Sequence, residues 1–165
     1  GTTSENVDRL ERCVAKHGAT RLVFLGDFLH SADGRVERTL QRFADWRASR
    51  REVEIVLVRG NHDDRAGDPP EEWSIRCVDP GEAMAPFALV HEPKAVKGGY
   101  ALAGHIHPAV RMTGGPGESA RLPCFWFGPR VGVLPSFGAF TGSAVVRPKA
   151  GDRVFVIADD EVIAV

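Results

Sequence analysis

The first half of the chain alternates between helix-like and strand-like hydrophobic patterns. Apolar side chains recur every three or four residues between positions 2 and 17, which predicts an amphipathic helix that Gly18 ends. Continuous apolar runs at 21–27 and 54–59 predict two buried strands, and the periodic segment 36–51 between them predicts a second helix. A strand, a helix and another strand form a βαβ unit, so we expect the two strands to be parallel neighbours.

The second half is dominated by short strands separated by turns. Apolar runs predict strands, and a final hairpin, at 75–78, 87–90, 100–103, 122–127, 153–157 and 161–165. The chain contains 18 glycines and 11 prolines, which also favours many short elements joined by turns. Helix–strand alternation followed by strands predicts an α/β protein of two sheets. At 165 residues we expect a single domain that covers positions 1–165.

Composition and charge exclude some classes of protein. The net charge is −1, which argues against a uniformly basic nucleic-acid binder and against an acidic disordered chain. The charge is unevenly distributed, because positions 84–155 carry 8 basic and 3 acidic side chains while positions 1–83 carry 13 and 16. A positive segment is compatible with a face that meets phosphates, although charge alone favours arginines scattered over several surfaces.

The cysteines and the apolar runs bear on the cellular compartment of the protein. Cys13, Cys77 and Cys124 lie far apart and form no Cys-x-x-Cys pair, so they predict neither a disulfide framework nor a zinc knuckle. We expect buried free thiols in a reducing cytoplasm. No apolar run approaches the length of a membrane span.

Polar clusters directly follow four of the predicted strands. They contain Asp27, Asn61 with His62, His91, and His105 with His107. In a layered α/β fold the carboxyl ends of strands meet along one edge, where ligands bind. Imidazoles mixed with carboxylate and amide oxygens favour manganese, iron or zinc. The two side chains of His-x-His point to opposite faces of a regular strand, so we expect Gly104 to turn the backbone there.

The motifs resemble those of a known family. In order and spacing, the four clusters resemble the calcineurin-like metallophosphoesterases through Gly26-Asp27, Gly60-Asn61-His62-Asp63, His91 and Gly104-His105-Ile106-His107. Segments 26–31, 105–110, 122–128 and 134–142 further resemble the bacterial ligase-associated metallophosphoesterases, which are linked to a DNA ligase and a helicase in DNA-repair operons. The resemblance implies a four-layer αββα sandwich of two mixed sheets flanked by helices.

The resemblance also implies a metal set. It implies two divalent ions, with Mn²⁺ favoured over Fe or Zn, in an enzyme that hydrolyses phosphodiester bonds. Asp27 would be shared by both ions, and His107 would bind the first. The ligands implied for the second ion are Asn61, His91 and His105. Together the ions would polarise the phosphoryl oxygens for in-line displacement.

Two further residues carry roles through the same resemblance. His62 would lie outside the metal ligands and donate a proton to the leaving group. Asp63 would orient His62 by accepting its other ring N–H. The resemblance therefore predicts a nuclease or phosphodiesterase that acts on DNA in repair, beside a DNA ligase or helicase.

One element of the family pattern is not found in this sequence. The family motif begins with Asp-x-His on the first strand, and no Asp-x-His precedes Gly26-Asp27. We expect this strand to lie upstream of Gly1, which would make positions 1–165 a fragment of the enzyme.

Other residues leave alternatives open. Four residues are candidates either to contact the metal-binding side chains without binding the metal themselves or to contact substrate: His30, Lys94, Arg121 and Arg130. Phe125-Trp126-Phe127 lies between those two arginines and suggests base stacking, although alternating aromatic residues on a strand favour a core position. The alternative functions are a DNA- or ligase-binding module with a remnant metal site, and a nucleotide or small-molecule phosphatase.

Overall fold

The computed structural model describes residues 3–28, 36–63, 67–115, 119–138, 142–159 and 161–165. It divides into two compact units, Gly1–Asp79 with Phe137–Phe140, and Pro80–Ser136 with Thr141–Val165. Each unit contains its own sheet. The single domain expected over residues 1–165 stays a prediction.

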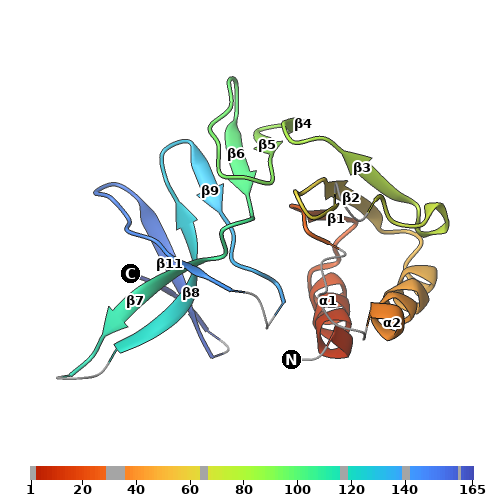
Figure 1. The fold of residues 1–165 in the computed structure, drawn as a ribbon, viewed down its shortest axis with the longest axis horizontal. Coiled ribbons are helices and arrows are strands. Elements are labelled where there is room, and N and C mark those ends of the chain that lie inside the picture. The colour runs from red at the N-terminus through yellow and green to blue at the C-terminus, as the bar shows by residue number, and fades with distance from the viewer. Residues whose placement is uncertain (1–2, 29–35, 64–66, 116–118, 139–141, 160) are drawn as a thin grey trace. The chain divides into compact units, whose positions relative to one another are not determined.

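The first unit contains both α-helices of the described residues and a three-stranded parallel sheet (Figure 1). Its elements are α1 (Thr3–His17), β1 (Arg21–Phe24), α2 (Val36–Ser49), β2 (Glu54–Val58), the 3-10 helix η1 (Glu71–Trp73) and β3 (Ile75–Val78). β2 lies in the middle and pairs in parallel with β1 and with β3. The predicted βαβ unit and the strand at 75–78 are therefore confirmed. Neither α-helix is long and apolar enough to cross a membrane, within the residues described.

The core of the first unit lies between the two helices and the sheet. The buried side chains of this cluster are Val7, Leu10 and Val14 of α1, Phe43 and Trp46 of α2, and Val53, Ile55 and Trp73. At the end of α1, Gly18 adopts a positive φ of 57° and the Ala19 N–H donates to the Val14 carbonyl, which closes the helix.

The free thiols divide between core and surface. Cys124 is buried, which raises the pKa of its thiol to about 11, and Cys77 is half-buried. Cys13 is exposed, so the prediction of buried thiols is wrong for this residue. The reason is its position on α1, where the neighbouring Leu10 and Val14 supply the buried face.

Within its described residues the second unit contains nine strands in one mixed sheet (Figure 1). They are β4 (Glu82–Met84), β5 (Phe87–Leu89), β6 (Tyr100–Ala103), β7 (Pro108–Thr113), β8 (Ser119–Phe127), β9 (Val131–Val133), β10 (Ala144–Val145), β11 (Arg153–Ala158) and β12 (Glu161–Ala164). The sheet order is β10-β7-β8-β9-β6-β5-β4, and β11 pairs with both β8 and β12. Two sheets and few helices confirm the mixed α/β class.

Arg47 is a buried cation that joins the end of α2 to two neighbouring segments. Its side chain is 3% exposed, and burial lowers the pKa of the guanidinium. Nε donates to the Trp73 carbonyl at 2.6 Å, and Nη1 donates to the carbonyls of Arg50 and Val53 at 2.7 Å. This one side chain therefore satisfies backbone acceptors before β2 and at the end of η1.

We predict that Arg47→Met destabilises the protein by roughly 2–4 kcal/mol, because it leaves buried carbonyls without donors. Chemical denaturation measures this free energy of unfolding. The control is Arg42→Met, since Arg42 forms an exposed ion pair with Asp8 and such pairs contribute about 0–1 kcal/mol. Equal losses at the two positions would show that the buried hydrogen bonds of Arg47 are not important.

Candidate functional site

The first unit places its predicted site residues in two loops at one edge of its sheet. Asp27 follows the end of β1, and Asn61, His62 and Asp63 follow the end of β2. Because β1 and β2 are parallel neighbours, their carboxyl ends and the following loops lie together. The Asp27 N–H donates to Asp63 Oδ2 at 2.6 Å, and the His62 N–H donates to Asp27 Oδ1 at 3.1 Å. Each loop therefore donates a backbone hydrogen bond to a carboxylate of the other loop.

Asp63 holds this arrangement together. It is 3% exposed, and its carboxylate also accepts the N–H of Phe28 at 3.0 Å and that of Gly60 at 2.9 Å. It therefore binds three backbone N–H groups, two from the loop after β1 and one from the loop after β2. No local pattern in the sequence indicates this role of Asp63. The orientation of the His62 ring by Asp63 stays a prediction.

The second unit brings two predicted histidines into direct contact. His91 follows β5 and His105 follows β6, and these strands are parallel neighbours. His91 Nε2 and His105 Nδ1 lie 2.9 Å apart, and the Gly104 N–H donates to the His91 carbonyl at 3.0 Å. His91 is 2% exposed, so this pair lies at the buried end of its loops.

His107 is held in one tautomer by the backbone. Its Nδ1 lies 2.8 Å from the Gly142 carbonyl oxygen. A carbonyl only accepts hydrogen bonds, so Nδ1 carries a proton, and in the neutral ring Nε2 then holds the lone pair. A hydrogen bond of this kind commonly orients a metal-binding histidine.

The backbone turns at the predicted ligands themselves. Asp27, His105 and His107 adopt positive φ angles of 56°, 66° and 48°, in the left-handed region. Gly104 does not adopt a positive φ, so the prediction that this glycine makes the turn is wrong. Asp and His tolerate the left-handed region better than most residues, and each such residue costs about 1–3 kcal/mol. Strain of this size concentrates at functional sites.

The histidine pair offers two imidazole nitrogens at neighbouring strand ends, and imidazole is a common ligand of divalent transition metals. The 2.9 Å between His91 Nε2 and His105 Nδ1 is a hydrogen-bond separation, so one of the two nitrogens would release its proton if both bound one ion. The imidazole nitrogens of the second unit, taken by themselves, suit a divalent transition metal, and so do the carboxylate and amide oxygens of the first unit.

Comparison with known proteins agrees with this chemistry. The family model described as calcineurin-like phosphoesterase matches residues 1–109. The chain belongs to this family. Its structure is similar to the crystal structure of Pseudomonas putida nuclease MPE, with 39% sequence identity and a TM-score of 0.89, over 99% of this chain and 80% of that one. The comparison with curated proteins gives no match. The family resemblance predicted from the motifs is confirmed.

The other candidate residues of this phosphoesterase lie on its surface or outside the described residues. His30 belongs to the segment that the structure does not describe. Lys94 is exposed in the loop after His91. Arg130 is exposed and donates to the Val96 carbonyl at 2.7 Å, and Arg121 is exposed and lies 3.4 Å from the Ser143 hydroxyl. No contact of these three residues with the histidine pair is described.

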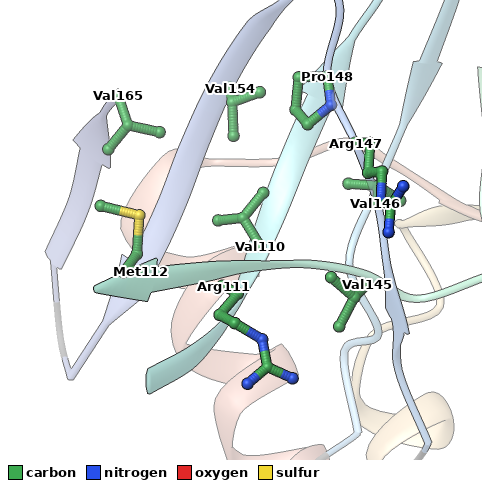
Figure 2. A pocket seen from close by; sticks show the side chains of 9 residues that line it. All are labelled: Val110, Arg111, Met112, Val145, Val146, Arg147, Pro148, Val154 and Val165. Carbon is green, nitrogen blue, oxygen red and sulfur yellow. The ribbon is translucent and has the colours of Figure 1, made fainter. Parts of the chain in front are cut away.

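A pocket of about 500 Å³ lies elsewhere in the second unit (Figure 2). It is lined by Val110, Arg111, Met112, Val145, Val146, Arg147, Pro148, Val154 and Val165. None of these lining residues is a predicted metal ligand, and two of them, Arg111 and Arg147, are cationic.

We predict that Asp63→Asn lowers the free energy of unfolding by roughly 2–3 kcal/mol. An amide has one acceptor oxygen and turns an NH₂ group toward backbone donors, so at least one buried N–H loses its partner. Denaturation curves compare it with Asp45→Asn, an exposed position that accepts a hydrogen bond from Gln41 and still can as Asn. If both variants are equally stable, Asp63 does not hold the loops.

Proposed function

We propose that this protein is a metal-dependent phosphodiesterase that cleaves nucleic acid, with DNA as its substrate. The observation that carries the proposal is the 2.9 Å approach of His91 Nε2 to His105 Nδ1 at two parallel strand ends, in a chain of the calcineurin-like family. The similarity to a protein described as a nuclease supports a nucleic-acid substrate.

We propose that two divalent ions are held by five residues. The ligands are Asp27, which both ions share, His107 at the first ion, and Asn61, His91 and His105 at the second. Manganese is the proposed metal, with iron and zinc as the alternatives that imidazole and carboxylate ligands also accept. When bound, such ions activate a water molecule and polarise the phosphoryl oxygens.

The protein's own residues then position the reaction. The proposed proton donor is the His62 ring, whose backbone N–H is anchored on the Asp27 carboxylate. Asp63 holds the loops of both residues, so the donor keeps its place relative to the proposed shared ligand. The Gly142 carbonyl lies 2.8 Å from His107 Nδ1, so Nε2 is the ring nitrogen proposed to coordinate.

A role in DNA repair, beside a DNA ligase or helicase, is the finer part of the proposal. Its support is the resemblance of segments such as 122–128 and 134–142 to the ligase-associated metallophosphoesterases.

We predict that His62→Ala separates good leaving groups from poor ones. Cleavage of a DNA oligonucleotide expels an alkoxide that needs a proton, so kcat with manganese falls about 10²–10⁴-fold. Hydrolysis of bis(4-nitrophenyl) phosphate expels a stabilised phenolate, so its kcat falls much less. Both rates are measured beside metal content, which stays unchanged.

The matched control is His17→Ala, an exposed position at the end of α1 whose loss leaves both rates unchanged. Equal losses on the two substrates of the His62 variant would overturn its role as proton donor.

We predict that His91→Ala and His105→Ala each remove bound metal. Isothermal titration with Mn²⁺ and elemental analysis measure this loss, which exceeds tenfold in affinity because one imidazole cannot replace the pair. A protein that binds no metal but still binds DNA in a salt-sensitive way would instead be a binding module. Turnover of phosphate monoesters in preference to diesters would indicate a small-molecule phosphatase.

A further inference from the structure

Strand β8 presents aromatic side chains on two different faces. Side chains alternate along a strand, so Cys124 and Trp126 share one face; Cys124 belongs to the buried cluster with Val110, Val154 and Val156, and the half-buried Trp126 packs against it. Phe125 and Phe127 lie on the other face and are half-buried. The expected core packing is confirmed for Trp126 only in part, because it is half-buried against that cluster. The two phenylalanines are also half-buried but pack against none of the described core clusters.

The neighbouring strand β11 extends this second face. Phe155 pairs with Phe125, and Arg153 pairs with Phe127. The Phe125 and Phe127 rings are parallel within 5° with centroids 6.4 Å apart, and the Phe155 ring meets Phe127 edge-on at 5.9 Å. We call these three phenylalanines the β8 aromatic face. The Arg153 guanidinium lies 6.0 Å from the centre of the Phe127 ring.

A glycine makes room for this arrangement. Gly132 of β9 pairs with Phe127. A Cβ at this position would lie 2.7 Å from Phe127 Cδ1, well inside contact distance. The absence of a side chain at Gly132 lets the Phe127 ring lie over the sheet instead of standing away from it.

Arginines that form no ion pair with a described residue lie beside this face. Arg121 has the same parity as Phe125 and pairs directly with Arg111 of β7. Like charges opposite each other destabilise an antiparallel pair, and both side chains are exposed. Figure 2 shows the Arg111 side chain leaving β7 on the side opposite to Val110, although both residues line the pocket described above.

The described ion pairs leave these arginines available. All of them lie in the first unit, and within the described part of the chain none involves Arg111, Arg121 or Arg153. An anion between Arg111 and Arg121 would turn their repulsion into attraction. Flat apolar rings beside unpaired guanidinium groups are complementary to a polyanion that carries planar bases.

We propose that the β8 aromatic face binds single-stranded nucleic acid. Bases stack on Phe125, Phe127 and Phe155, while phosphates contact the three arginines, Arg111, Arg121 and Arg153. A duplex does not fit this chemistry, because its bases are already stacked and paired and offer no free ring face. The choice of ligand rests on the proposed nuclease function.

The register relates this face to the histidine loop. Ala103 pairs with Val133, which pairs with Trp126, and Ala109 pairs with Pro123. The loop 104–107 therefore falls level with residues 124–125 along β8. A single-stranded nucleic acid bound to the β8 aromatic face would therefore lie at the same height along the sheet as His105 and His107.

Phenylalanine-to-leucine substitutions test the face, because leucine keeps apolar volume and loses the flat ring. Anisotropy of a labelled oligothymidylate, with a chelator present so that no cleavage occurs, measures binding. We expect Phe125→Leu with Phe127→Leu to weaken binding at least tenfold. Phe125→Tyr with Phe127→Tyr, which keeps both rings, restores it. The unsubstituted protein binds the single strand more tightly than a duplex of the same length.

Substitution of the exposed Arg121 gives a second test that leaves the packing between the rings unchanged. For Arg121→Gln the slope of log K against log salt becomes shallower by about 0.7, the value for one phosphate contact on a single strand. The control is Arg12→Gln, an exposed arginine on α1. An unchanged slope for Arg121→Gln would remove the phosphate contact from the proposal.

Hydrolysis of bis(4-nitrophenyl) phosphate keeps this inference separate from the proposed function. The leucine variants keep wild-type turnover of this small diester, because it reaches the strand-end loops without needing the aromatic face. Leucine variants that bind the oligonucleotide normally, or that lose small-diester turnover as well, overturn the inference. The inference is also overturned if the unsubstituted protein is a dimer and the leucine variants are monomers, because the face is then an interface between copies of the chain. If small-diester turnover is absent throughout but ring-dependent binding holds, the proposed function alone fails.

Discussion

The buried carboxylate of Asp63 is the interaction on which the first unit's site depends. Two parallel strands bring their following loops to one sheet edge, but strand pairing alone does not hold loop atoms in place. Asp63 accepts N–H groups from both loops, and the Asp27 carboxylate accepts one in return from His62. An ionised acceptor makes hydrogen bonds about twice as strong as a neutral one, and removing it leaves several donors unsatisfied at once. Position is therefore set by one side chain.

The second unit reaches the same result with different means. Parallel pairing of β5 and β6 brings His91 and His105 together, and backbone hydrogen bonds from Gly104 and to Gly142 fix the loop. The cost is a left-handed backbone at His105 and His107. A left-handed backbone of this kind persists where the surrounding hydrogen bonds stabilise it by more than its strain costs. Here it turns the two imidazoles of His-x-His away from the alternating directions of a regular strand.

Charge is distributed differently in the two units. The described ion pairs belong to the first unit, where Arg59, for example, bonds to Asp68 and Asp79 and lowers the pKa of the Asp68 carboxyl. In the second unit Arg111 and Arg121 face each other across β7 and β8. A protein that tolerates such a pair in the absence of ligand gains attraction for phosphate when the ligand arrives, and this links the proposed aromatic face to the proposed chemistry.

The sequence by itself determined the helices, most of the longer strands, the βαβ unit and the order of the polar clusters. These follow from local periodicity, because a side chain's face depends on neighbours a few residues away. It did not predict β4, β9 and β10, since two or three residues are too short to show a period. It also missed the six-residue β7, whose pairing with β8 is a long-range contact. Only the tertiary structure decided that His105 and not Gly104 turns the backbone, that Asp63 bonds to two loops, and that Phe125 and Phe127 lie outside the core. Each of these depends on a partner far along the chain, on β11, β9 or the loop after β1, and no local pattern records which distant segment a strand will pair with.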